Sequence, residues 1–454
     1  MALTVLPLMT RHLTAADYGF FALVVSVVAA IGILPTVGSS AAMARHFSGA
    51  TTEARMDLIA NILTLATALG IVGAVLFVPI WHFILYYLQD DVGRLTTLDL
   101  VLVLISIVGT GWAPIAAEAL TLDGRARVFA VVSIVRDAIG ALAGVVALYV
   151  YDMGGTSLFI SLAVASVADV VLSAAALSRY LGGRLSFSLC RALLREMHLT
   201  AANVFDTGGV VVERGLISAN IGLNVLGIVS HSQTYENLMM IVTKAVSRAS
   251  WADCLAEARR GTRDFSTSMM VTEIISVLCT MGAVALATVG YDAIGILSHG
   301  KFSYAAYFAA IWMGTIALRT TGFAPKALVY ASGRAEFFSV SVIVSRVLSI
   351  AILFLLASHW GGVAIVLAGV TSALVAKAIV FALANRIAPV PFQDLRPVLA
   401  LVFALTLSLV SYHFATTFID RVALCIVASV VVAVVHRRVL LAILRHLPRL
   451  LPVP

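Results

Sequence analysis

The sequence predicts an all-α protein that crosses a membrane many times and is built from two similar bundles of helices. Three observations predict this class. Of its 454 residues, 61% are hydrophobic and only 12% are charged, and the mean hydropathy is +1.04. Soluble globular chains carry roughly 45 to 50% apolar and about 25% charged residues, so this composition excludes a soluble enzyme, a secreted disulfide scaffold and a disordered chain. The second observation is that long apolar stretches recur along the chain. The third is that several short sequence motifs of the first half occur again in the second half.

Each apolar stretch is long enough for a helix that spans a bilayer, which needs about 20 residues. The predicted spans are 18–43, 58–80, 98–120, 128–150, 157–178, 199–221, 223–247, 266–290, 305–330, 338–357, 361–384, 397–418 and 421–436. Residues 1–10 would add half a span, and a helix of that length cannot cross about 30 Å of hydrocarbon. We therefore expect the first helix to be partial or to begin upstream of Met1.

The basic residues of the loops predict the orientation. If successive loops alternate between the two sides and the loop at 45–57 is cytosolic, nineteen arginines lie in cytosolic loops. The four bases on the other side are Arg11, Arg94, Lys301 and Arg421. Such an excess on the cytosolic side is the positive-inside pattern. The longest connection, 179–198, has Leu189, Leu193 and Met197 on one helical face, which predicts an amphipathic helix on the lipid surface or a plain linker.

An internal repeat divides the chain into two lobes. At an offset of about 207 to 211 residues, Gly-Trp-Ala-Pro at 111–114 meets Gly-Phe-Ala-Pro at 322–325, and Gly-Arg-Ala at 124–126 meets the same residues at 333–335. The offset spans six helices, which predicts parallel lobes related by a pseudo-two-fold axis along the membrane normal. The domains expected are an N-terminal lobe at 1–178, a cytosolic amphipathic linker at 179–198, a C-terminal lobe at 199–390, and an extra helix pair with a basic tail at 391–454.

Two short motifs give the chain a resemblance to a known family. The segment Leu-Thr-Ala-Ala-Asp-Tyr-Gly-Phe at 13–20, and the loop motif Leu-Asp-Gly-Arg at 122–125 with its second copy Ala-Ser-Gly-Arg at 331–334, resemble bacterial O-antigen and exopolysaccharide flippases. These proteins belong to the multidrug, oligosaccharidyl-lipid and polysaccharide exporter superfamily. The sequence departs from the family in its short first helix and in an Ala where a Pro usually precedes the Tyr-Gly pair.

The resemblance implies a multi-pass transporter of the bacterial inner membrane and not an enzyme. Its substrate would be a polyprenyl-pyrophosphate-linked oligosaccharide, and its partners would be membrane lipids and the glycosyltransferases and polymerase of the same pathway. We expect no cofactor, no metal and no nucleic acid partner. The four cysteines are scattered and show no zinc-ligand spacing.

Ionisable side chains within the predicted spans are the candidate functional residues, because a charge in the bilayer costs at least about 2.5 to 3.5 kcal/mol and needs a cavity or a partner. The bases that would bind pyrophosphate are Arg214, Lys244, Arg319 and Lys326. The acids that would bind a coupling ion or neutralise those bases are Asp206, Glu213 and Glu236. Asp137 and Arg346 occupy equivalent positions of the repeat and could pair across the lobes. Structural ion pairs and snorkelling side chains are the alternative for all of these residues.

Two other functions stay open at this point. A cation-coupled multidrug antiporter would share the superfamily and the lobes, but it would favour an acidic cavity. A membrane polymerase or ligase of lipid-linked glycans would need a sizeable external loop, and the longest one, 81–97, is short. The sequence also contains neither a GxxxxGK[ST] nor an HExxH motif.

Overall fold

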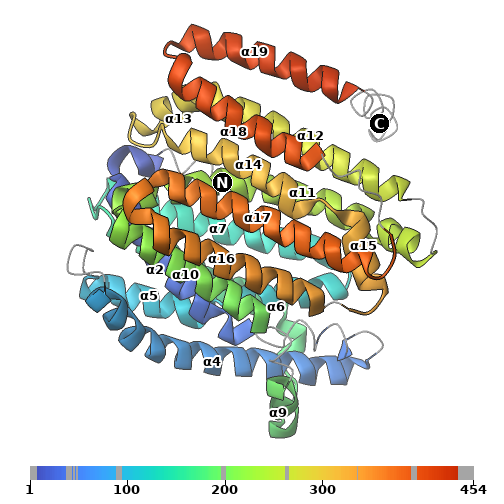
Figure 1. The fold of residues 1–454 in the computed structure, drawn as a ribbon. Coiled ribbons are helices and arrows are strands. Elements are labelled where there is room, and N and C mark those ends of the chain that lie inside the picture. The colour runs from blue at the N-terminus through green and yellow to red at the C-terminus, as the bar shows by residue number, and fades with distance from the viewer. Residues whose placement is uncertain are drawn as a thin grey trace, which may run out of the picture. The chain divides into compact units, whose positions relative to one another are not determined.

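The structure, a computed structural model, describes residues 8–36, 43, 46–47, 50–87, 95–195, 201–260, 265–334, 336–389 and 396–437. Three predictions concern residues outside these ranges: the first seven residues of the partial helix, Met197 of the linker, and the basic tail beyond residue 437. In the described ranges every regular element is a helix (Figure 1). The prediction of an all-α membrane protein is confirmed, and among the described residues ten segments are long and apolar enough to cross a bilayer.

The chain forms two compact units, Met1–Gly227 and Ile228–Pro454. The helices of unit 1 are α2 (Ala15–Gly32), α4 (Thr52–Tyr87), α5 (Thr97–Gly109), α6 (Trp112–Leu122), α7 (Ala126–Tyr149), α8 (Thr156–Ala176), α9 (Phe187–Arg195) and α10 (Ala201–Asn220). Helix α11 (Leu223–Arg259) begins in unit 1 and continues into unit 2. Unit 2 continues with α12 (Ser266–Ala287), α13 (Gly290–Ser298), α14 (Ala305–Thr320), α15 (Phe323–Ala331), α16 (Glu336–Trp360), α17 (Gly362–Asn385), α18 (Arg396–Phe414) and α19 (Phe418–Val435).

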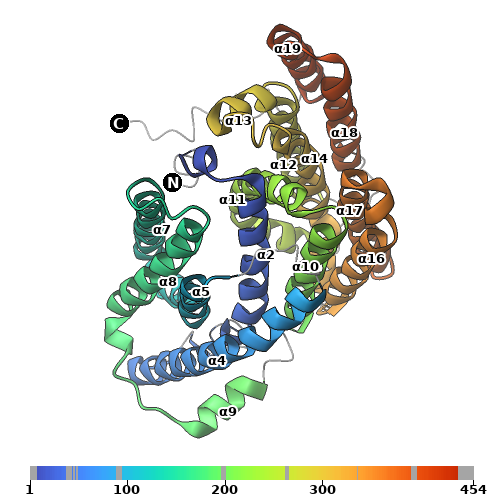
Figure 2. The same cartoon turned by 90° about the vertical axis from the view of Figure 1, so that its left-hand side faces the viewer.

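In unit 1, α8 lies between α5 and α7 (Figures 1 and 2). Helix α10 packs against α2 in the same unit. The amphipathic helix α9 turns its apolar face to protein, since Leu193 is only 4% exposed and joins Leu189 in a cluster with side chains of α4 and α6. Side chains of unit 1 therefore cover that face, in place of lipid. This agrees with the plain linker, one of the two alternatives drawn from the sequence. The lobe and linker boundaries drawn from the repeat remain a prediction.

The motif at 13–20 is explained by the start of α2. Thr14 and Asp17 form a capping box, in which the Thr14 hydroxyl accepts from the Asp17 N–H and the Asp17 carboxylate accepts from the Thr14 N–H. Gly19 lies directly against the first turn of α11, where a Cβ atom would overlap the carbonyl oxygen of Leu223. Gly227 makes the reciprocal contact with Ala15. The motif thus encodes a helix start followed by a close helix contact.

In unit 2, α14 is the central helix and is packed by α12, α17 and α18. Most of its residues are buried, and many are small, including Ala309, Ala310 and Ala317. A Cβ atom on Gly314 would lie 2.8 Å from the Cα of Leu401 in α18. Lipid tails are as apolar as leucine, so helices in membranes associate through such close packing of small residues.

The repeated aromatic-Ala-Pro motifs mark helix interruptions. The predicted span 98–120 consists of α5 and α6, and the predicted span 305–330 consists of α14 and α15. In each copy the second helix begins at the aromatic residue, Trp112 or Phe323. Gly322 precedes Phe323 with φ +84°, a left-handed conformation that favours glycine. The second copy therefore has a true break at this point.

The loop motif at 122–125 has a structural role in unit 1. Asp123 forms an ion pair with Arg179, and Arg125 donates a hydrogen bond of 3.2 Å to the carbonyl oxygen of Ala176 at the end of α8. Gly124 and its equivalent Gly333 both have φ +74°. The second copy has Ser332 where the first has Asp123, so the turn is repeated but the carboxylate is not.

Candidate functional site

The break between α14 and α15 brings together several polar side chains of unit 2. Residues 321 and 322 interrupt the helix, and Thr321 has an extended backbone with ψ −177°. The Thr321 hydroxyl donates back to the carbonyl oxygen of Ala317, one turn earlier. An interrupted helix leaves backbone groups without partners from the same helix, so other side chains must approach it.

Two predicted bases, Arg319 and Lys326, flank this break. The Nζ of Lys326 donates a hydrogen bond of 2.7 Å to the backbone carbonyl oxygen of Arg319, and it lies 6.0 Å from the ring centre of Phe323. The Lys326 ammonium thus sits at the negative end of the α14 dipole. The Arg319 side chain is exposed, with 42% of its surface accessible. The structure therefore brings together two of the four bases expected to bind substrate.

The carboxylate of Glu236 on α11 faces the same break. Its Oε1 lies 4.0 Å from Nη1 of Arg319, at the limit of an ion pair. One turn earlier, Ser232 Oγ accepts a 3.0 Å hydrogen bond from Trp312 Nε1 of α14. Ser232 and Glu236 therefore lie on one face of α11 directed at α14. The long ion-pair distance leaves Arg319 only loosely held.

A further base, Lys377, was missed in the sequence. It lies on α17, and its Nζ donates a 3.2 Å hydrogen bond to Thr321 Oγ1 in the break. Its signal was available, because Lys377 is an ionisable residue in the middle of the predicted span 361–384. Together the site has three cations and one carboxylate, carried by four helices. Such a group of bases suits an anion with more than one negative charge.

The other predicted bases lie elsewhere. Arg214, on α10 of unit 1, donates a 2.5 Å hydrogen bond from Nη1 to the backbone carbonyl oxygen of Ala22 in α2. Lys244 is exposed on α11, and within the described part of the chain no hydrogen bond or ion pair to it is found. The structure thus ties Arg214 to a helix contact within unit 1, and Lys244 is not part of the group at the break.

The remaining predicted acids are spread over both units. Asp206 and Glu213 lie half-buried on α10. Asp137 accepts a 2.8 Å hydrogen bond from Nε of its neighbour Arg136 on α7, while Arg346 lies half-buried on α16 of unit 2. A pairing between Asp137 and Arg346 stays a prediction.

Unit 1 carries the opposite charge beside its own helix interruption. Asp169 of α8 is 4% exposed, and its Oδ1 lies 3.6 Å from Nη1 of Arg136. The backbone N–H of Ala113, in the first turn of α6, also bonds to Asp169. In the internal repeat, the glycine pair at 154–155 aligns with the pair at 361–362, an offset of 207 residues. At this offset Asp169 aligns with position 376, one residue from Lys377. The two units therefore present an acid and a base at corresponding places.

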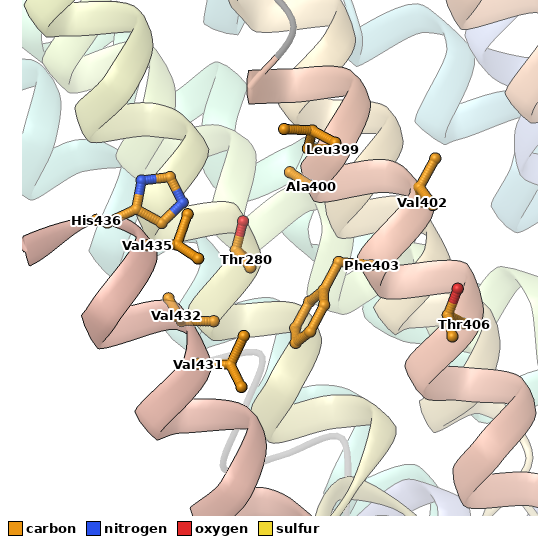
Figure 3. A pocket seen from close by; sticks show the side chains of 10 residues that line it. All are labelled: Thr280, Leu399, Ala400, Val402, Phe403, Thr406, Val431, Val432, Val435 and His436. Atoms are coloured by element: carbon orange, nitrogen blue, oxygen red, sulfur yellow. The ribbon is translucent and has the colours of Figure 1, made fainter.

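An apolar pocket lies apart from the break, between α12, α18 and α19 (Figure 3). Its volume is about 340 Å³. The lining residues are Thr280, Leu399, Ala400, Val402, Phe403, Thr406, Val431, Val432, Val435 and His436. Of these only His436 can carry a charge, and it lies 4.0 Å from Glu273. The pocket suits an apolar chain and not a phosphate.

Comparisons with solved structures show that the chain shares the fold of several known membrane proteins. The chain is similar to the lipid II flippase MurJ in an inward closed conformation, with a TM-score of 0.69 and 10% identity over 97% of both chains. It is also similar to an inward-facing MATE multidrug transporter of the MOP superfamily, with a TM-score of 0.66 and 12% identity over 90% of this chain and 94% of that one. An outward-facing MATE transporter matches at a TM-score of 0.57 and 14% identity, over 82% and 88%.

The family follows from the sequence match. The family described as "Polysaccharide biosynthesis protein" matches residues 8–297, which is more than half of the chain, and the chain belongs to this family. No curated protein matches it in sequence. The resemblance drawn from the motifs at 13–20 and 122–125 is confirmed.

Proposed function

We propose that this protein moves a polyprenyl-pyrophosphate-linked oligosaccharide from the cytosolic to the outer leaflet of the bacterial inner membrane, for O-antigen or exopolysaccharide synthesis. The observation that carries the proposal is the group of bases at the break between α14 and α15, within a chain of the polysaccharide biosynthesis family. The pyrophosphate would contact these bases, and the polyprenyl tail would stay in apolar surroundings. Alternating access of the two lobes would carry the head group across.

The acids have supporting roles in this proposal. Glu236 neutralises Arg319 while the site is empty, and an arriving phosphate takes over the arginine because Arg319 offers two parallel N–H donors. Asp206 and Glu213 would bind the coupling proton or cation. Arg214 and Lys244 would contact the head group in other stages of transport, and an Asp137–Arg346 pair would hold one access state. Glycosyltransferases would supply the substrate and a polymerase would consume it.

Deletion of the gene tests the function. We expect lipid-linked oligosaccharide to accumulate on the cytosolic leaflet, measured by accessibility to an added glycosidase in inside-out and right-side-out vesicles. Complementation with Arg319→Gln should restore less than a tenth of the flipping rate, because a charge-assisted contact to phosphate contributes about 1.5 to 3 kcal/mol. Arg259→Gln is the matched control, since Arg259 is an exposed base at the end of α11.

Two outcomes would replace the proposal. Unchanged glycan together with altered drug efflux would support the cation-coupled multidrug antiporter, which the similarity to MATE transporters favours as second candidate. Lengthened glycan made by the purified protein would support the membrane polymerase or ligase. Against the antiporter, the site at the break has more bases than acids, and a cationic drug would be repelled by it.

A further inference from the structure

The chain that leads into α9 is fixed to α4 through its backbone. Asn61 of α4 is fully buried, and its side-chain amide donates a 2.8 Å hydrogen bond to the carbonyl oxygen of Arg184 and accepts one of 2.7 Å from the N–H of Ser186. Asp57 Oδ1 accepts a 2.6 Å hydrogen bond from the N–H of Arg184. The backbone is therefore held on both sides of Leu185, and the Leu185 side chain cannot turn towards α4.

This attachment leaves large apolar side chains facing outward. Leu185 is 67% exposed and Phe187 is 86% exposed. Since an α-helix turns about 100° per residue, Phe187, Arg191 and Leu194 lie on one face of α9, opposite the face that packs on unit 1. Leu194 is 40% exposed. An apolar surface of this kind marks a site of interaction with a partner or a membrane.

The charge of the same segment is purely positive. Residues 182–195 contain three arginines and neither Asp nor Glu. Arg184 and Arg191 are exposed, and among the described residues no side chain forms an ion pair or a hydrogen bond with either guanidinium group. Exposed arginines beside exposed Leu and Phe are the combination that binds the surface of an anionic membrane.

The anchor on α4 sets the depth of this segment in the membrane. Helix α4 has 36 residues, which makes it about 54 Å long and longer than about 30 Å of hydrocarbon. Asp57 and Asn61 lie at the start of the predicted span 58–80, on the side predicted to be cytosolic. Figures 1 and 2 show α9 beyond α4 at the outer edge of unit 1. At this depth the surroundings are lipid headgroups and the upper parts of acyl chains, not a soluble protein.

We propose that residues 184–194 form a docking site for the anionic lipid surface of the cytosolic leaflet. Leu185 and Phe187 insert among the upper acyl chains, and Arg184 and Arg191 bind lipid phosphates. Leu194 extends the apolar contact along α9. The lipid contact is thus made by the side of α9 opposite to the one predicted from the sequence. The inference goes beyond the proposed function and does not depend on which substrate is moved.

A fluorescent dye at position 187 tests whether this side meets lipid. Phe187→Cys is labelled in full-length protein whose four native cysteines are replaced by alanine, in nanodiscs that hold one copy each. The discs contain phosphatidylcholine, increasing fractions of phosphatidylglycerol, and a phospholipid with a nitroxide quencher near its headgroup. We expect the quencher to act roughly threefold more strongly on this dye than on a dye at Arg259→Cys, an exposed position at the end of α11. Quenching at position 187 should rise with the fraction of phosphatidylglycerol.

The double variant Arg184→Gln/Arg191→Gln tests the role of the charges. A base near an anionic leaflet contributes about fivefold to binding, so the fraction of phosphatidylglycerol at half of the maximal quenching should rise severalfold. The matched control, Arg259→Gln/Arg260→Gln, removes two exposed bases at the end of α11 and should leave this titration unchanged. Both double variants should unfold at the temperature of the parent protein.

Three results would overturn the inference. The first is equal quenching at positions 187 and 259, which is expected if the segment serves a soluble partner or a second copy of the chain. The second is quenching at position 187 that depends neither on phosphatidylglycerol nor on the two arginines. The third is an equal shift of the titration in the control pair, which would reflect the total charge of the protein and not a site on α9.

Discussion

At the residue scale, Glu257 fixes the start of a neighbouring helix. Its carboxylate accepts hydrogen bonds from the backbone N–H of Thr267 at 2.6 Å and of Ser268 at 3.0 Å, in the first turn of α12, and from the Ser268 hydroxyl at 2.9 Å. Glu257 lies beyond the predicted span 223–247 and is 7% exposed. Burial opposes its ionisation, but the hydrogen bonds from Thr267 and Ser268 outweigh burial and hold the pKa of Glu257 below its usual 4.5.

This cap predicts a pH-dependent effect of Glu257→Gln. Because the pKa of Glu257 is lower in the folded state, its contribution to stability is present in full above the unfolded pKa and is lost as pH falls through the folded pKa. At pH 7 we expect the substitution to cost roughly 1 to 2 kcal/mol. Thermal unfolding in detergent at pH 7 and near pH 3 measures this difference. A gap between variant and wild type that does not shrink at low pH would contradict it.

Arg421 is a second residue with an outsized structural role. The sequence placed it only as an external loop base, yet it is 8% exposed. Its guanidinium donates to Asp292 Oδ1 at 2.5 Å, to the carbonyl oxygen of Ala415 at 3.0 Å and to that of Thr416 at 3.2 Å. It also lies 4.4 Å from the ring centre of Tyr291. Arg421 thus joins the turn between α18 and α19 to α13.

We expect Arg421→Met to destabilise the protein by about 3 to 5 kcal/mol, because it leaves Asp292 without its main counter-charge. The stability of Arg421→Lys should lie between that of Arg421→Met and that of the wild type, since an ammonium keeps the charge but loses the planar fork of the guanidinium. Thermal unfolding in one detergent ranks the three proteins. A methionine variant as stable as the wild type would mean that the turn is held by other contacts.

The roles predicted for the charged residues stay predictions, but the structure shows which of these residues lie together. Arg319, Lys326 and Glu236 gather at the break because a charge within a span needs partners. Arg214 is also a charge within a span that has a partner, but the partner is the backbone carbonyl oxygen of Ala22. Every residue has a backbone carbonyl, so no sequence pattern predicts which one Arg214 contacts. Lys377 could have been found, since it lies within a predicted span.

At the element scale, the contact between α2 and α11 depends on two glycines. Gly19 faces the carbonyl oxygen of Leu223, and Gly227 faces Ala15. Both neighbours are backbone atoms, which cannot rotate away as a side chain would. Any larger side chain must therefore push the helices apart.

We predict that Gly19→Leu destabilises the protein by about 1 to 3 kcal/mol or more through overpacking. The matched control is Gly208→Ala on α10, where a Cβ atom meets open space and alanine favours the helix. Thermal unfolding compares the two variants. Equal stability of Gly19→Leu and the wild type would show that the helices separate without cost.

Hydropathy predicted where helices cross the membrane but did not divide the spans at the two aromatic-Ala-Pro motifs, where the structure interrupts the helices. The predicted spans 128–150 and 361–384 agree with α7 and α17 within two residues, because hydrophobic length decides where a helix crosses lipid. The same rule merged α14 with α15, since hydropathy is continuous across the break. The repeated Pro after an aromatic residue and Ala was the only local sign of it, and the conformation of Gly322 depends on its surroundings.

At the scale of the whole molecule, the charge distribution predicts which loops face the cytosol. We expect a cysteine introduced as Lys301→Cys, in a variant with the four native cysteines replaced by alanine, to react with a membrane-impermeant maleimide in intact cells with a permeable outer membrane. Arg259→Cys should react only after the inner membrane is opened. Labelling in the opposite order would reverse the orientation.

Four of the described helix starts, those of α2, α5, α12 and α19, share a property that bears on biogenesis. Thr14, Thr96 and Thr417 each form a capping box with an Asp three residues later, and α12 is capped by Glu257. Every one of these capping groups precedes its helix in the chain or lies in its first turn. A ribosome therefore delivers each cap before the greater part of the helix that it starts. We expect these boundaries to be set vectorially during insertion, without waiting for later segments to emerge.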